Sequence, residues 1–114
     1  MPVSPDEFRR IALSQPGASE SSHMDHPDFR VGGKIFATLG YPDGACGMVK
    51  LPPELQHEFS QRAPKAFVPV KGTWGKQGAT TVILSLVSKR GLREAMEIAC
   101  KARATKPQKT KSVR

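Results

Sequence analysis

Two adjacent glycines separate two stretches of alternating residues in the segment FRVGGKIFATLG, positions 29–40. Phe29 and Val31 flank Arg30 before the glycines, and the apolar residues at 35, 37 and 39 form a second alternating set after them. A two-residue turn between antiparallel strands needs positive φ at both central positions, which glycine adopts without steric cost. The segment therefore predicts a β-hairpin centred on Gly32-Gly33.

The same glycines precede a lysine, so a phosphate-binding loop is the competing interpretation. The Walker pattern requires a glycine five residues before the Gly-Lys pair and a serine or threonine after it, but Asp28 and Ile35 occupy these positions. The dinucleotide-binding pattern requires a helix after the glycines, whereas the sequence predicts a strand there. Both missing features favour the hairpin.

The first half of the chain predicts a helix followed by antiparallel strands. Ser4 and Glu7 have the spacing of a capping box, with Pro5 at the first helical position, and the Pro16-Gly17 pair ends this helix. We expect an edge strand near residues 20–24 and a turn at residues 26–28. After the hairpin, residues 41–44 predict another turn, and a further strand begins at residue 46.

The second half predicts two helices around two strands. Two consecutive prolines at 52–53 open a helix that ends at Pro64. Pro69 restricts residues 67–70 to an edge strand or an irregular one. The β-branched residues at 80–84 fit a central strand. Between these strands we expect a glycine-rich loop carrying Trp74, and the last helix should begin near Gly91.

The net charge of +8 is concentrated at the C-terminus. Residues 1–100 contain 12 Lys and Arg against 10 Asp and Glu, whereas residues 101–114 contain six Lys and Arg and no acid. The tail becomes polar after Ala104, so we expect a single folded domain over residues 1–104 and a disordered basic tail over residues 105–114. Such tails bind polyanions without sequence preference.

Composition also limits the compartment and the chemistry. The chain has no apolar run long enough to span a membrane and no secretory leader at its start, so we expect a cytoplasmic protein. Cys46 and Cys100 lie far apart without a neighbouring ligand, which favours reduced thiols over a disulfide or a zinc site. No nucleophile and base can be paired, and we expect neither an enzyme nor a cofactor.

Several motifs in one order resemble the MmcQ/YjbR family, over about residues 5–104. They are LSQPGASE at the end of the first helix, FRVGGKIFATL, MVKLPPEL, and Trp74 before the strand TTVIL and the closing helix. The resemblance implies an α+β two-layer sandwich like that of bacterial frataxin, with an antiparallel sheet packed against the N- and C-terminal helices. It also implies DNA binding through a double-wing arrangement of hairpins, an analogy made at the level of the fold.

Candidate contacts to nucleic acid fall into four groups: the hairpin tip, the aromatic loop, the start of the last helix and the tail. Arg30 and Lys34 flank the hairpin tip, although charged tips also serve solubility. Trp74 between lysines has the composition of a base-stacking surface, although a single tryptophan is more often a core or lid residue. The full set is Arg30, Lys34, Lys71, Trp74, Lys76, Lys89, Arg90, Arg93, Lys106, Lys109, Lys111 and Arg114.

Three further interpretations remain to be compared. The segment HMDHPD at 23–28 contains metal-ligand types, but it lacks a distant further ligand, so we expect no metal site. The leading hypothesis is a monomeric, non-enzymatic protein that binds DNA weakly and without sequence preference. The alternative is a protein- or small-ligand-binding module that uses the surface near Trp74, with an incidental basic tail.

Overall fold

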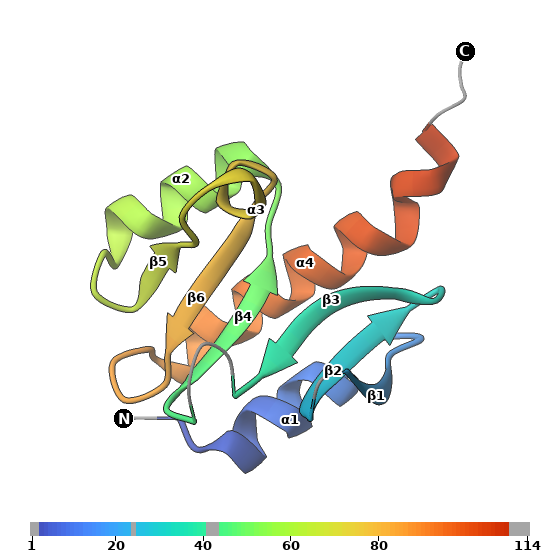
Figure 1. The fold of residues 1–114 in the computed structure, drawn as a ribbon, viewed down its shortest axis with the longest axis horizontal. Coiled ribbons are helices and arrows are strands. Elements are labelled where there is room, and N and C mark those ends of the chain that lie inside the picture. The colour runs from blue at the N-terminus through green and yellow to red at the C-terminus, as the bar shows by residue number, and fades with distance from the viewer. Residues whose placement is uncertain (1–2, 24, 41–43, 110–114) are drawn as a thin grey trace.

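The computed structural model describes residues 3–23, 25–40 and 44–109, which form a six-stranded antiparallel sheet and four helices (Figure 1). The elements are α1 (Pro5–Leu13), β1 (Ser19–His23), β2 (His26–Val31), β3 (Lys34–Leu39), β4 (Cys46–Lys50), α2 (Pro53–Arg62), β5 (Phe67–Pro69), α3 (Thr73–Lys76), β6 (Ala79–Ile83) and α4 (Lys89–Lys109). The strand order is β1-β2-β3-β4-β6-β5. The expected α+β sandwich is confirmed.

The β2–β3 hairpin has the predicted turn. Gly32 and Gly33 have φ angles of +59° and +79°, and Val31 pairs with Lys34 across them. The strand assignments at the other edge are also confirmed, because β5 with its Pro69 pairs only with β6, while β6 lies between β4 and β5. Proline is tolerated at an edge because one side of that strand needs no hydrogen-bond donor.

Two local expectations are wrong. Residues 26–28 are not a turn but the start of β2, because the chain reverses one step earlier, where Asp25 takes a φ of +67°. The expected loop around Trp74 contains a short helix, α3. The last helix begins near Gly91 as expected, at Lys89, where the Ser88 hydroxyl accepts a hydrogen bond from the Gly91 backbone N–H.

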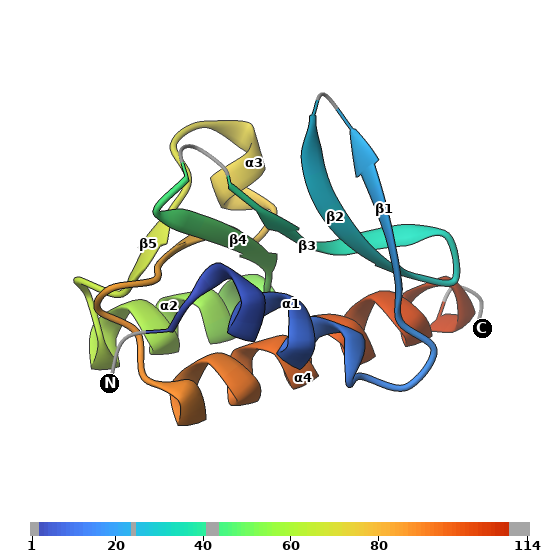
Figure 2. The same cartoon turned by 90° about the horizontal axis from the view of Figure 1, so that it is seen from below.

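Helices α1 and α4 cover one face of the sheet and lie side by side in the same direction (Figure 2). Phe8 of α1 is fully buried, 6.1 Å from the Phe29 ring between centroids. A Cβ atom on Gly47 of β4 would lie only 2.5 Å from the Phe8 ring, so this glycine allows α1 to approach the sheet closely. Among the described residues, no helix combines the length and apolarity that crossing a membrane requires.

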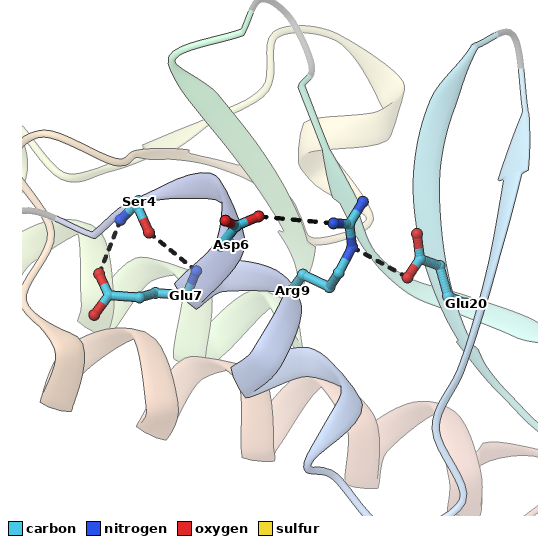
Figure 3. Close-up of polar contacts among 5 residues, drawn as sticks. All are labelled: Ser4, Asp6, Glu7, Arg9 and Glu20. Atoms are coloured by element: carbon cyan, nitrogen blue, oxygen red, sulfur yellow. Dashed lines mark hydrogen bonds and ion pairs between the residues drawn. The ribbon is translucent and has the colours of Figure 1, made fainter.

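The start of α1 is fixed by the predicted capping box (Figure 3). The Ser4 hydroxyl accepts from the Glu7 N–H at 3.1 Å, and the Ser4 N–H donates to the Glu7 carboxylate at 3.0 Å. Arg9 lies between two acids, with its guanidinium 3.8 Å from Asp6 and 3.2 Å from Glu20 of β1. The second of these ion pairs connects α1 to the edge strand.

Candidate functional site

A cleft of about 270 Å³ lies between α1 and α4, and we call it the cationic cleft. It exists because the two helices run in the same direction with their N-terminal ends adjacent (Figure 2). Three cations and one carboxylate line it, so its formal charge is positive. Its lining residues are Glu7, Arg10, Ile11, Ser14, Lys89 and Arg93.

Glu7 and Lys89 form the ion pair that joins the two helices. Lys89 Nζ lies 2.6 Å from the Glu7 carboxylate, and about a quarter of the Glu7 side chain is exposed. The hydrogen bond from Lys89 lowers the pKa of Glu7 below its ordinary value, and the Ser4 backbone N–H acts in the same direction. Glu7 is therefore ionised at neutral pH, and the charge of Lys89 is largely compensated.

Arg10 and Arg93 provide the uncompensated charge of the cleft. Both are exposed, and no carboxylate of the described residues lies within ion-pair distance of either. The neighbouring Arg9 differs, because Asp6 and Glu20 flank it. Two unpaired guanidinium groups on facing helices can each donate several hydrogen bonds to the oxygens of a phosphate or carboxylate. The arrangement is suited to an anion.

The predicted cluster at the start of α4 divides between two surfaces. Lys89 and Arg93 are four residues apart and share the side that faces α1. Arg90 lines a different cleft, which α4 forms with residues of α2. The structure therefore brings together two of the three cations expected there.

The hairpin tip presents fewer available donors than the sequence suggested. Arg30 donates two hydrogen bonds, at 2.8 and 3.1 Å, to the carboxylate of Asp28, which is fully buried. The hydrogen bonds to Asp28 raise the pKa of Arg30. Lys34 lies beside the turn and is half-buried. Arg30 therefore compensates a buried charge, and its contact to a phosphate stays a prediction.

Helix α3 holds Trp74 on the surface, which excludes the core alternative, and its stacking on bases stays a prediction. Its side chain is 56% exposed, and the flanking Lys71 and Lys76 are exposed as well. The turn around it is tightly built. A Cβ atom on Gly75 would overlap the Val70 carbonyl oxygen, at 1.5 Å, and one on Gly78 would overlap that of Leu51, at 1.8 Å.

The buried amide of Gln56 attaches α2 to this turn. Its Nε2 lies 3.0 Å from the carbonyl oxygens of Gly75 and Ala79 and 3.2 Å from the Thr80 hydroxyl. These contacts were not expected from the sequence, where Gln56 reads as an outward polar residue of an amphipathic helix. The result is a firmly held turn that presents a tryptophan to solvent.

The remaining candidates are the four basic residues of the tail. Helix α4 continues through positions 106 and 109, while Lys111 and Arg114 lie outside the described residues. The expected limits of the domain and of the disordered tail stay predictions. Within residues 3–23, 25–40 and 44–109, no three His, Cys, Asp or Glu side chains are grouped as metal ligands.

The two cysteines lie in the interior of the fold. Cys46 and Cys100 are both buried and are not joined in a disulfide. Burial raises the pKa of the Cys100 thiol, which disfavours the thiolate that a nucleophile requires.

Arg10 is the functional candidate that sequence reasoning missed. The Arg9-Arg10 pair is visible on the first helix, but only the packing of α1 beside α4 distinguishes the residue that faces Arg93 from the one held by carboxylates. The sequence indicates the α4 side of the cleft, because Lys89 and Arg93 are four residues apart and so share one face of a helix. It does not indicate that Arg10 joins them.

The comparisons with known proteins agree with the fold. The family model described as YjbR matches residues 13–99. The crystal structure of Deinococcus radiodurans protein DR2400, with family-model domain DUF419, superposes with a TM-score of 0.74 at 22% identity, covering 93% of this chain and 81% of that one. No curated protein sequence matches. At this identity the structural likeness supports the architecture alone.

Proposed function

Because the chain belongs to the YjbR family, we propose that it is a non-enzymatic protein that binds the phosphate backbone of DNA. The observation that carries the proposal is the cationic cleft, which Arg10 of α1 and Arg93 of α4 both line without carboxylate partners among the described residues. Guanidinium groups contact phosphates with two parallel hydrogen bonds, and such contacts position a protein on DNA without reading its sequence.

The distribution of charge supports the same proposal. Positive and negative charges nearly balance over the first 100 residues, and Arg9, Arg30 and Lys89 are each paired with a carboxylate. The two unpaired arginines of the cationic cleft are therefore a local excess of positive charge. The six basic residues after position 100 add long-range attraction. We expect weak affinity that falls with salt, because each neutralised phosphate releases condensed counterions.

The test is fluorescence anisotropy of a labelled duplex of about 20 base pairs, titrated with the full chain across a series of salt concentrations. The double variant Arg10→Ala with Arg93→Ala should make the slope of log K against log salt less negative by about 2, since each phosphate contact contributes about 0.9. Lys65→Ala with Lys101→Ala removes the same charge from exposed positions outside the cleft and is the matched control.

Two outcomes would contradict the proposal for the folded domain. The first is a control variant that changes the salt slope as much as the cleft variant does, because the effect would then depend on total charge and not on the cleft. The second comes from a further full-length variant, with glutamine at positions 106, 109, 111 and 114, which measures the share of the tail. If binding disappears in that variant alone, the tail accounts for the interaction.

A second candidate function is favoured by the exposed tryptophan. Trp74 is the only tryptophan of the chain, and its turn is held by the buried Gln56 amide. This arrangement suits a binding module for a protein or small ligand. Quenching or a spectral shift of Trp74 by a partner, at a salt concentration that abolishes DNA binding, would support the second candidate over the first.

A further inference from the structure

A second cleft, of about 370 Å³, lies on the side of α4 opposite the cationic cleft. The C-terminal half of α2, the start of β5, the loop before α4 and the first turns of α4 form its walls. None of its lining residues belongs to the cationic cleft, so the two sites are built from separate residues. We call it the α2–α4 cleft.

The floor of the α2–α4 cleft is apolar. Phe59 and Phe67 are buried and pack edge to face, with ring centroids 5.1 Å apart. Leu86 stands at the side of the cleft with 57% of its surface exposed. Clefts of about 300–1,000 Å³ with apolar walls and a few polar groups are typical of small-molecule sites. This one lies near the lower end of that range, so it fits a single ring.

A glycine keeps the wall beside Phe67 open. Gly91 lies in the first turn of α4, where alanine would favour the helix by about 1 kcal/mol. A Cβ atom at this position would lie 3.8 Å from the Phe67 ring and 3.0 Å from the Ser88 hydroxyl that caps the helix. The absent side chain thus leaves space next to the aromatic floor and preserves the cap.

The rim of the cleft carries one uncompensated cation. Arg62 lies over the Phe59 ring at 4.7 Å from its centroid, and its guanidinium is 3.5 Å from Glu94. This pair spans from α2 to α4 and is roughly neutral. Arg90 is exposed on the same rim, and no carboxylate of the described chain lies within ion-pair distance of it. A ligand with an apolar body and one negative charge would complement both features.

We infer that the α2–α4 cleft binds a small carboxylate that carries an aromatic ring, with the ring against Phe59 and Phe67 and the carboxylate at Arg90. Arginine recognises a carboxylate through two parallel hydrogen bonds. Packing of the ligand ring against Phe59 and Phe67 removes apolar surface from water, which favours binding. This site uses none of the residues that line the cationic cleft, and it assigns a role to the third cation at the start of α4.

The test uses phenylacetate as the probe and its neutral analogue phenylacetamide as the matched ligand control. Both are titrated into the ¹⁵N-labelled full chain at about pH 7, and amide shifts are followed in ¹H–¹⁵N spectra. Phenylacetate should shift the amides of Gly91 and its neighbours with a millimolar Kd. Phenylacetamide should bind at least about tenfold more weakly, because it offers no charge to Arg90.

Three variants separate this site from the cationic cleft. Arg90→Ala should weaken phenylacetate binding about tenfold, and Leu86→Ser should weaken it by reducing the apolar wall. Both side chains are exposed, so the fold should persist. Arg93→Ala, on the same helix, should leave phenylacetate binding unchanged and weaken DNA binding.

The inference is overturned if phenylacetate and phenylacetamide bind equally, if the shifted amides lie away from the cleft, or if Arg90→Ala and Arg93→Ala have the same effect. Failure of the DNA proposal would appear separately, as an unchanged salt slope in the Arg10 and Arg93 double variant.

Discussion

Replacing Gln56 with glutamate changes the side-chain NH₂ group, a hydrogen-bond donor, into an oxygen that only accepts. The change lies where α2 contacts the turn that carries Trp74. The Gln56 side chain is 8% exposed, and its Nε2 faces three oxygen atoms, of Gly75, Ala79 and Thr80. The Thr80 hydroxyl donates to the Gly78 carbonyl, so its oxygen is an acceptor toward Gln56. A carboxylate at this position would therefore meet oxygen atoms with no donor directed at it.

The size of the effect follows from the hydrogen bonds that a carboxylate cannot make. An amide has two N–H groups, so Gln56→Glu removes two hydrogen bonds at about 1 kcal/mol each. At neutral pH the introduced charge is also buried and unpaired, and we expect a total decrease of about 3–5 kcal/mol in the free energy of unfolding. A protonated acid can still donate once, so the decrease should fall to about 1–2 kcal/mol at low pH.

The direction of the pH dependence follows from the surroundings of the introduced acid. Burial beside acceptors raises its pKa in the folded state above its unfolded value of about 4.3. The variant is therefore most stable, relative to the wild type, below about pH 4.3, and it loses stability as pH rises through the higher folded pKa. Comparing variant with wild type at each pH removes the acid dependence that both chains share.

Urea unfolding, monitored by Trp74 fluorescence and by far-ultraviolet circular dichroism, measures the difference at about pH 4 and pH 7. Gln77→Glu is the matched control, because it makes the same chemical change at an exposed position beside α3 and should alter stability by less than about 0.5 kcal/mol. A Gln56→Glu variant as stable as this control at neutral pH, or one whose deficit grows at low pH, would show that the Gln56 amide does not hold the turn.

Two further predictions test the hairpin and the helix connection. Gly33→Ala should lower the free energy of unfolding in urea by about 1–2 kcal/mol, because the backbone there has a φ of +79°. The control Gly44→Ala should lower it by less than about 0.5 kcal/mol, because nothing lies within 4 Å of the new Cβ. Equal losses in the two variants would contradict a left-handed turn at Gly33. Lys89→Met should raise the pKa of Glu7 while the Ser4 N–H keeps it below its ordinary value. In the wild type the stability that Glu7 contributes is present above the ordinary pKa of glutamate and is lost as pH falls through the lowered pKa. Carboxyl ¹³C titration of both chains should show a higher pKa of Glu7 in Lys89→Met. Identical titrations would disprove the contact between Glu7 and Lys89.

The parts of the fold that could be predicted are those set by local backbone chemistry. The turn at Gly32-Gly33 was predictable because a two-residue hairpin turn requires positive φ at both positions, and both observed φ angles are positive. The start of α1 was predictable because Ser4 and Glu7 exchange side-chain to backbone hydrogen bonds. The turn expected at residues 26–28 failed for a non-local reason. Those residues pair with β1, and that pairing places the reversal at Asp25.

The candidate site was less accessible to sequence reasoning because it depends on which helices become neighbours. The exposure of Trp74 follows from the contact of Gln56 with residues far along the chain, Gly75 and Ala79, which no short-range pattern contains. The proposed role of Arg10 likewise requires α1 to lie beside α4. Composition correctly indicated cations at the start of α4 but could not divide them between surfaces.

That division follows from the geometry of α4. Each residue turns the helix by roughly 100°, so Lys89 and Arg93 return to one flank while Arg90 and Glu94 share the other. The core stripe between the flanks carries Leu92 against the sheet, fully buried. One helix therefore supports two clefts of different character, a polar one shared with α1 and an aromatic one shared with α2. Arg90 and Arg93 line different clefts but are three residues apart, so they are neighbours on the exposed side of α4. Comparing the double variant with the two single variants therefore measures any coupling between the two ligands.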